Sequence, residues 1–157
     1  MIDRSFSWHF AQTQEDAEVV RLLRNLGREW FCDSAHITPE SQATWWEANK
    51  GSVLCVIVGD PPVGYGMLRV RDGRSWVSLA VDPDARGCGW GRAIYDLLGR
   101  LSTGPIYAAI RQDNAASRKA AECAGYVRVA IDPPGVDPAC QIDWVVVHYA
   151  PTQETTP

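Results

Sequence analysis

The stretch VDPDARGCGWGR, residues 81–92, is the most informative part of the chain. It follows a β-rich run at 76–81 and precedes apolar residues at helical spacing from 93 to 101. Its three alternate glycines let the backbone approach a bulky ligand. The first amides of the following helix have no internal partners and point outward. A strand, a glycine turn and a helix in this order predict a binding site for a pyrophosphate.

Charge and spacing narrow the ligand of this turn. Arg86 and Arg92 place positive charge beside the amides, which favours a diphosphate over a neutral ligand. The glycines lack the Gly-x-Gly-x-x-Gly interval, and no acidic residue follows about twenty positions on at a strand end, so a dinucleotide fingerprint is excluded. No Gly-Lys-Ser/Thr follows, which excludes a P-loop. The remaining alternative is a helix start that merely turns tightly.

Hydrophobic periodicity predicts further elements on both sides of the turn. Strands are expected at 5–11, 52–58, 63–70, 76–81, 106–110, 126–131 and 141–149, and helices at 13–27, 38–51, 93–101 and 114–124. Residues 13–16 resemble a capping box, and turns at 59–62 and 71–74 join the strands on either side as hairpins. This order predicts an α/β (α+β) fold with a mixed sheet and helices on its faces.

Length and composition predict one folding unit. A chain of 157 residues fits one core, so we expect a single domain at residues 1–150 and a flexible tail at 151–157. A net charge of −4 gives no field that attracts nucleic acid or an anionic membrane. The longest apolar run, 53–58, is too short to span a bilayer, and the first residues hold no signal core. We therefore expect a cytoplasmic protein that binds neither membrane nor nucleic acid.

Cysteines and histidines suggest no metal site. The five cysteines are odd in number and irregularly spaced, without a Cys-x-x-Cys pair, and the three histidines are scattered. Neither a disulfide framework nor a metal cofactor is indicated.

Two spaced motifs carry a family resemblance. The first is Arg86-Gly87-Cys88-Gly89-Trp90-Gly91, and the second is Asn114-Ala115-Ala116-Ser117 with Gly125-Tyr126 eleven residues beyond the asparagine. Together they resemble the GNAT superfamily of acyl-CoA N-acyltransferases, whose hallmark is Arg/Gln-x-x-Gly-x-Gly/Ala. The resemblance covers residues 76–129 by motif and most of the chain by element order. It implies a mixed, mostly antiparallel central sheet of six to seven strands with about four helices.

The resemblance also implies a co-substrate, acetyl-CoA or another acyl-CoA, and a set of residues that bind it. Backbone groups of the strand would pair with the pantetheine and acyl groups, turn amides would hold the pyrophosphate, and Asn114 and Ser117 would face the pantetheine arm. The expected cofactor-binding residues are Leu79, Ala80, Val81, Arg86, Gly87, Cys88, Gly89, Trp90, Gly91, Arg92, Asn114 and Ser117. For Asn114 the alternative is a helix cap.

The chain departs from the family pattern at the proton-transfer positions. Many relatives use a tyrosine seven residues after the motif asparagine as the acid, and some use a glutamate five residues before it as the base. Here those positions hold Ala121 and Ala109. Ser117, Cys123, Tyr107 and Tyr126 lie near the relevant segments, but each also fits a role in the core or as a cap. We assign no catalytic residue from sequence.

Two functions follow as hypotheses. The first is an N-acyltransferase that moves an acetyl or other short acyl group to a primary amine by direct attack in a ternary complex. The amine acceptor would be a small molecule, a protein or an aminoacyl group. The second is a catalytically silent acyl-CoA sensor or interaction module, motivated by the two alanines. The resemblance is also compatible with a homodimer paired through the last strands.

The residues that would bind the acceptor are harder to predict from the sequence. Relatives place the acceptor at the first two helices and the last strands, which here contribute several ring-bearing residues: Trp30, Phe31, His36, Trp45, Trp46, Trp144 and His148. Core packing is the alternative for each of them. Glu29, Glu40 or Glu47 would favour a cationic amine if they faced this region.

Overall fold

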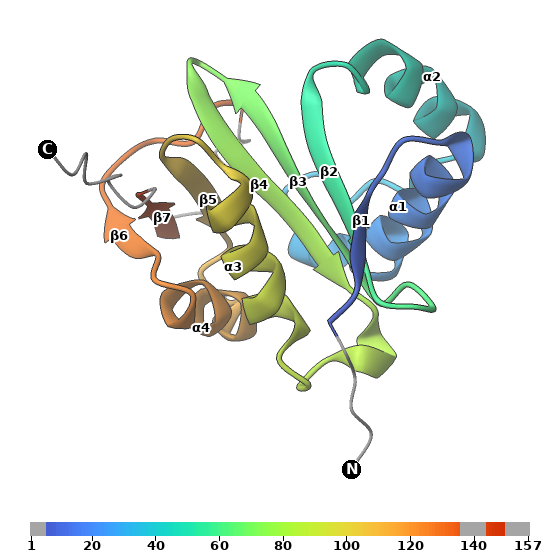
Figure 1. The fold of residues 1–157 in the computed structure, drawn as a ribbon. Coiled ribbons are helices and arrows are strands. Elements are labelled where there is room, and N and C mark those ends of the chain that lie inside the picture. The colour runs from blue at the N-terminus through green and yellow to red at the C-terminus, as the bar shows by residue number, and fades with distance from the viewer. Residues whose placement is uncertain (1–5, 136–143, 150–157) are drawn as a thin grey trace, which may run out of the picture.

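The computed structural model describes residues 6–135 and 144–149. Seven strands form one sheet in the order β1-β2-β3-β4-β5-β7-β6, and four α-helices pack on its faces (Figure 1). The α-helices are α1 (Gln14–Leu26), α2 (Pro39–Asn49), α3 (Trp90–Leu101) and α4 (Ala115–Cys123). The strands are β1 (Trp8–Phe10), β2 (Val53–Val58), β3 (Gly64–Arg71), β4 (Arg74–Val81), β5 (Ile106–Ile110), β6 (Val127–Val129) and β7 (Trp144–His148). Two 3₁₀ turns, η1 (Arg28–Trp30) and η2 (Pro83–Ala85), follow α1 and β4.

The sheet is antiparallel except at one central pair. β4 runs parallel to β5, and the two strands pair only at Ser75↔Ile106 and Trp76↔Tyr107. On its other edge β4 pairs with β3 over its whole length, from Arg71↔Arg74 to Gly64↔Val81. Beyond Trp76 the edge of β4 that faces β5 therefore has no strand partner, and Figure 1 shows the two strands diverging.

Each face of the sheet has its own core. Cys55, Ile57 and Tyr65 point to the face covered by α1 and α2, where Val20 and Trp46 complete the cluster. Alternate residues point to the face covered by α3 and α4, since successive strand side chains project to opposite sides. That second cluster includes Val56, Val58, Ile94 and Leu98.

Close packing of α3 on β3 depends on glycine. A Cβ on Gly66 would lie 2.6 Å from Ile94 Cγ2, closer than packed side chains come, and 3.1 Å from Leu98 Cδ1, which is also a tight contact. The absent side chain lets α3 approach the sheet, and this approach positions the amino end of α3 beside the end of β4 (Figure 1).

The sequence-based elements are confirmed with small changes of boundary. The capping box is formed by Thr13 and Asp16, and the 71–74 turn uses positive φ at Asp72 (48°) and Gly73 (72°). Strand β6 is shorter than expected, at Val127–Val129, and the described part of the last strand is Trp144–His148, since residues 141–143 lie outside the described residues. The expected tail, 151–157, lies outside the described residues. Over the described ranges, no helix has the length and apolarity needed to cross a membrane.

Candidate functional site

A pocket of about 650 Å³ opens where β4 and β5 diverge, between α3, α4 and η1. Its volume falls in the range of small-molecule and cofactor sites. Of the residues expected to bind a cofactor, all except Cys88 line it: Leu79, Ala80, Val81, Arg86, Gly87, Gly89, Trp90, Gly91, Arg92, Asn114 and Ser117. The Cys88 side chain is exposed outside the lining. The fold thus brings residues from β4, the glycine turn and α4 around one cavity.

The amino end of α3 differs from those of the other described α-helices. Side-chain oxygens cap the first turns of α1, α2 and α4, through Thr13, Thr38 and Asn114 respectively. The N-cap of α3 is Gly89, which offers no side chain, and the first turn of α3 holds no acidic residue. The amides of this turn are therefore left for a ligand, and the helix dipole adds partial positive charge there.

The turn geometry needs glycine at two positions. Gly87 and Gly89 have φ of +75° and +86°, values that L side chains rarely adopt. A Cβ at either residue would meet no protein atom within 4 Å, so the space beside them belongs to the pocket or to solvent. A bulky anion can approach the backbone from that side. These observations fit the pyrophosphate of CoA, with no side chain needed for the contact.

The open edge of β4 supplies a second backbone feature. Leu79, Ala80 and Val81 line the pocket beyond the last β4–β5 pair. Backbone donors and acceptors on that edge have no strand partner, so an extended amide-containing arm can pair with them as a strand would. The pantetheine arm of CoA contains two such amides.

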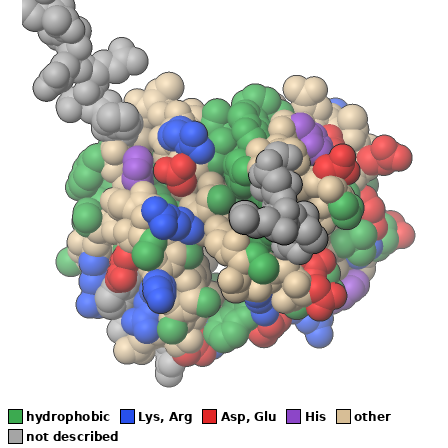
Figure 2. Space-filling model, turned by 60° about the horizontal axis from the view of Figure 1, so that its bottom comes forward, with side chains coloured by type: hydrophobic (Ala, Val, Ile, Leu, Met, Phe, Trp, Pro, Cys, Tyr) green, Lys and Arg blue, Asp and Glu red, His purple; other side chains and the backbone are tan. Residues whose placement is uncertain are grey.

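Cations outnumber anions around the large pocket. Arg86, Arg92 and Lys119 line it, and the lining carboxylate of Asp113 is held by Arg111 at 2.9 and 3.0 Å. Figure 2 shows Lys and Arg side chains gathered on the left, the side of α3 and α4, and Asp and Glu on the right. The local charge thus suits an anionic ligand although the chain is acidic overall.

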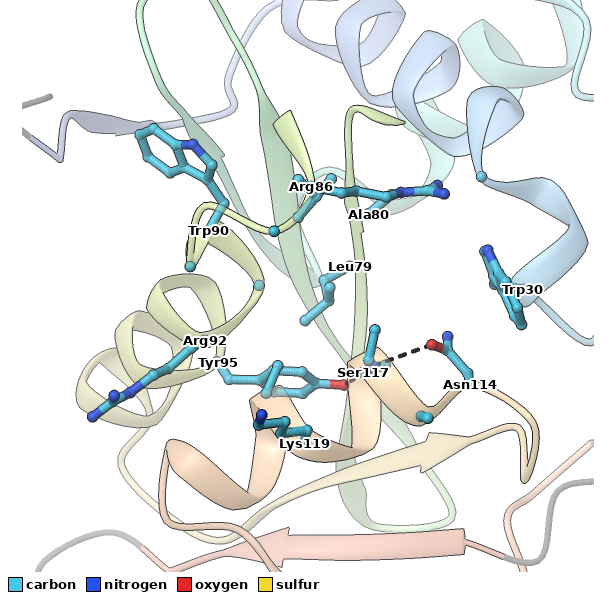
Figure 3. A pocket seen from close by; sticks show the side chains of 18 of the residues that line it. Trp30, Leu79, Ala80, Arg86, Trp90, Arg92, Tyr95, Asn114, Ser117 and Lys119 are labelled. Atoms are coloured by element: carbon cyan, nitrogen blue, oxygen red, sulfur yellow. Dashed lines mark hydrogen bonds between the residues drawn. The ribbon is translucent and has the colours of Figure 1, made fainter. Parts of the chain in front are cut away.

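The two predicted arginines point differently. Arg86 extends across the pocket toward η1, where a Cβ on Gly27 would lie 3.4 Å from its Nη2 (Figure 3). Arg92 points away from the cavity on the outer side of α3 (Figure 3). We therefore expect Arg86 to contribute its side chain to ligand binding, and Arg92 mainly its backbone amide.

Asn114 and Ser117 line the pocket from the start of α4. Asn114 Oδ1 accepts from the backbone N–H of Ser117 at 3.1 Å, so the predicted capping role of Asn114 is observed. The cap uses only the oxygen, and the side chain still lines the pocket. The Ser117 hydroxyl lies 2.8 Å from the Tyr95 hydroxyl, which reaches this point from α3 (Figure 3).

A second, smaller pocket of about 180 Å³ adjoins the first in the gap between β4 and β5. Six residues line both pockets: Trp30, Phe31, Leu79, Tyr95, Asn114 and Ser117. Val77, Ser78, Ala109 and Arg111 are among those that line the small pocket alone. A ligand in one pocket can therefore meet a ligand in the other at the shared residues.

The two family proton-transfer positions have different surroundings. Ala109 lines the small pocket, whereas Ala121 is fully buried and lines neither pocket. Among the predicted acceptor aromatics, Trp30 and Phe31 line both pockets and Trp46 is in the core at 2% exposure. Glu29, Glu40 and Glu47 line neither pocket. The side chain of Trp144 lies outside what the structure describes.

Sequence reasoning missed Tyr95. Its ring belongs to the apolar face of α3, so the sequence offered only core periodicity as a signal. In the fold it is 2% exposed yet lines both pockets. Burial raises the pKa of Tyr95 to about 12, although the hydrogen bond with Ser117 acts in the opposite direction. The hydroxyl is therefore protonated throughout the neutral range.

The comparisons with known proteins agree with this geometry. The model of the acetyltransferase (GNAT) family matches residues 19–126. A Sinorhizobium meliloti phosphinothricin acetyltransferase, solved with acetyl-CoA, superposes with a TM-score of 0.74 at 13% identity, covering 98% of this chain and 92% of that one. The spermidine N-acetyltransferase of Vibrio cholerae, solved with CoA and spermine, gives 0.74 at 12% identity, with coverage of 92% and 95%.

A third solved structure has a protein as its named substrate. The ribosomal-protein-alanine N-acetyltransferase of Brucella melitensis gives a TM-score of 0.71 at 19% identity, with coverage of 91% and 99%. At these identities the solved structures establish the shared fold. None of the curated proteins matches the chain.

Proposed function

The chain belongs to the acetyltransferase (GNAT) family, and from that premise we propose that it transfers an acetyl or other short acyl group from CoA to a primary amine. Acyl-CoA would supply an acyl group already activated as a thioester. The residues of this chain would hold it and admit the amine beside it. Direct attack in a ternary complex then forms the C–N bond as the C–S bond breaks.

One observation carries the proposal: two pockets meet at the gap between β4 and β5, and only one of them is built for an anion. The large pocket combines the uncapped start of α3, two positive-φ glycines and the open edge of β4. Among the described residues, the lining of the small pocket contains no glycine and no residue of the turn before α3. We propose that CoA occupies the large pocket and that the acceptor amine enters through the small one.

The lining of the small pocket offers, among the described residues, no histidine or carboxylate to act as a general base, and this bears on the mechanism. No side chain of that described lining can therefore take the proton of an ammonium group. The amine would have to lose its proton to water before attack. Positioning then supplies much of the rate, and activity is expected to rise with pH as more of the acceptor becomes uncharged.

Thiol release tests the proposed function. Purified protein is incubated with acetyl-CoA and a panel that includes amino acids, polyamines and peptides with a free amino terminus, and free CoA thiol is followed with time. We expect acceptor-dependent release with at least one class. Failure with every acceptor and every acyl donor, in protein that binds CoA, would overturn it.

An Ala109→Leu variant separates the two pockets. Ala109 lines the small pocket and not the large one, so a larger side chain there should obstruct the acceptor while CoA affinity stays within a factor of two. Equal loss of CoA affinity would contradict the assignment of the pockets.

The second candidate is a silent acyl-CoA sensor. Ala109 and Ala121 favour it, because neither can transfer a proton. It requires CoA binding without modification of any amine, so one confirmed turnover excludes it.

A further inference from the structure

The hydroxyl group of Tyr95 lies at the junction of the two pockets. The large pocket and the small pocket share six lining residues, and among these only tyrosine carries a titratable side chain. Tyr95 reaches the junction from α3, with its hydroxyl directed toward Ser117 and Asn114 (Figure 3). It is the group in this shared lining that can donate a proton to a reacting atom.

We propose that Tyr95 is the proton donor to the leaving sulfur of CoA in this chain. The inference rests on the proposed acyl transfer. It places the proton donor on α3, because α4 has no proton-donating side chain at the position that many relatives use. At the corresponding α4 position stands Ala121, which is fully buried and faces neither pocket.

The surroundings of Tyr95 hold its ring in one place. The Tyr126 hydroxyl donates to the backbone carbonyl of Tyr95 at 3.1 Å, and the two rings meet edge to face with centroids 5.0 Å apart. The Ser117 hydroxyl, 2.8 Å away, provides a hydrogen-bond partner that a ligand can replace. A fixed donor with one exchangeable partner meets the geometric requirement for an acid.

The protonation state also fits. Burial keeps the pKa of Tyr95 well above neutral pH. Tyr126 is the titratable group in ring contact with it, and the charged residues that line the large pocket with it are Arg86, Arg92, Asp113 and Lys119. The phenol is therefore a donor across the working range of an amine acyltransferase.

The proton balance of the step is closed. The amine nitrogen forms the C–N bond, and the electron pair of the C–S bond leaves with sulfur, which takes the phenol proton. The nitrogen gives up its surplus proton, and a water molecule returns one to the phenolate. The net result is an amide and a CoA thiol, with Tyr95 unchanged.

A thiol titration tests Tyr95 without any acceptor. CoA is bound to the parent, to Tyr95→Phe and to Tyr107→Phe, and thiolate absorbance is followed with pH. A hydrogen bond from Tyr95 would stabilise the bound thiolate, so Tyr95→Phe should raise the pKa of the CoA thiol by about one to two units. Tyr107→Phe is the matched control, because it removes a hydroxyl from a tyrosine of β5 that lines neither pocket. It should leave the thiol pKa unchanged.

Kinetics with an accepted amine give the second readout. Tyr95→Phe should lower kcat by about 100-fold with KM for the amine nearly constant. A Ser117→Ala variant keeps the donor, so its loss should stay below about tenfold. If folded Tyr95→Phe shows an unchanged thiol pKa and an unchanged kcat, the role of Tyr95 is overturned but the proposed function is not. A parent that shifts the thiol pKa but turns over no amine would instead overturn the proposed function.

Discussion

Helices α1 and α3 begin in opposite ways. The first turn of α1 is closed by its own side chains, since Thr13 and Asp16 exchange hydrogen bonds with each other's backbone. The first turn of α3 is left open by Gly89 and carries no acidic residue. A helix start that is completed internally stabilises the fold, and one that is left incomplete beside a cavity can bind an anion. The free backbone amides of the first turn thus stabilise the helix in α1, whereas in α3 they are left available for a ligand.

The largest expected effect on CoA affinity comes from blocking the amino end of α3 with a side chain. We expect Gly89→Val to abolish CoA binding, a loss of more than about 4 kcal/mol, because the branched side chain would stand on the ligand side of the turn and disfavour its φ of +86°. Calorimetry measures the affinity, and circular dichroism verifies folding.

The matched control is Gly73→Val. Gly73 also has a positive φ, +72°, and open space around its missing Cβ, but it lies in the β3–β4 turn. Both variants should lose similar stability, and only Gly89→Val should lose CoA. Tight CoA binding by folded Gly89→Val would show that the cofactor site is misplaced.

An acidic residue at the position of Asp16 would make α3 resemble α1. Arg92 stands third in α3, as Asp16 does in α1. Arg92→Asp should weaken CoA binding by about 2 kcal/mol, since a carboxylate near the helix start repels the pyrophosphate. Arg92→Ala separates this repulsion from loss of the arginine, and its effect should be small because the side chain points away (Figure 3). Equal affinities of the two variants would contradict ligand binding at this helix start.

Loss of one side-chain cation should have an effect of similar size. Arg86→Ala is expected to reduce CoA affinity by about 1 to 3 kcal/mol, as one charge-assisted contact is removed. Arg100→Ala is the control on α3, because that side chain is exposed and pairs with Asp96. Calorimetry at two salt concentrations should show a weaker salt dependence for Arg86→Ala. Indistinguishable affinities of these two variants would remove Arg86 from the site.

The smallest expected effect is on stability, and it concerns the capped amino end of α1. Burial raises the pKa of Asp16, but hydrogen bonds from the amides of Gln12 and Thr13 and from His9 outweigh it and lower the pKa to about 2. A depressed carboxyl pKa stabilises the fold above its ordinary value of 3.8, and this contribution is lost as pH falls toward 2. Asp16→Ala should therefore reduce the free energy of unfolding by about 1 kcal/mol at pH 7.

Denaturant titration at several pH values measures this difference. The gap between Asp16→Ala and the parent should shrink as pH falls from about 4 toward 2. Glu15→Ala, in the same turn, is the control for the helix dipole alone, with an expected change of about 0.3 kcal/mol. CoA affinity should be unaffected in both. A gap independent of pH would contradict the role of the carboxylate.

Most of the residues proposed to bind the cofactor are close in sequence, and the fold gathers them around one pocket. The turn from Arg86 to Gly91 and the helix after it are contiguous, and the proposed contacts are with backbone amides, so their geometry follows from glycine positions and helix ends. Asn114 is more distant in sequence, and it was predicted as a cofactor-binding residue only from the second family motif. Cys88 is the predicted residue whose side chain the fold turns away from the pocket.

By itself, the sequence determined the element order, the mixed sheet, the glycine turn and the family, because each depends on short-range periodicity or on contiguous motifs. Only the tertiary structure decided where β4 and β5 part, which arginine crosses the pocket, and that Tyr95, on α3, reaches the junction of the two pockets. Those features join residues distant in sequence, and a hydrophobic pattern says that a side chain is buried without saying what it is buried beside.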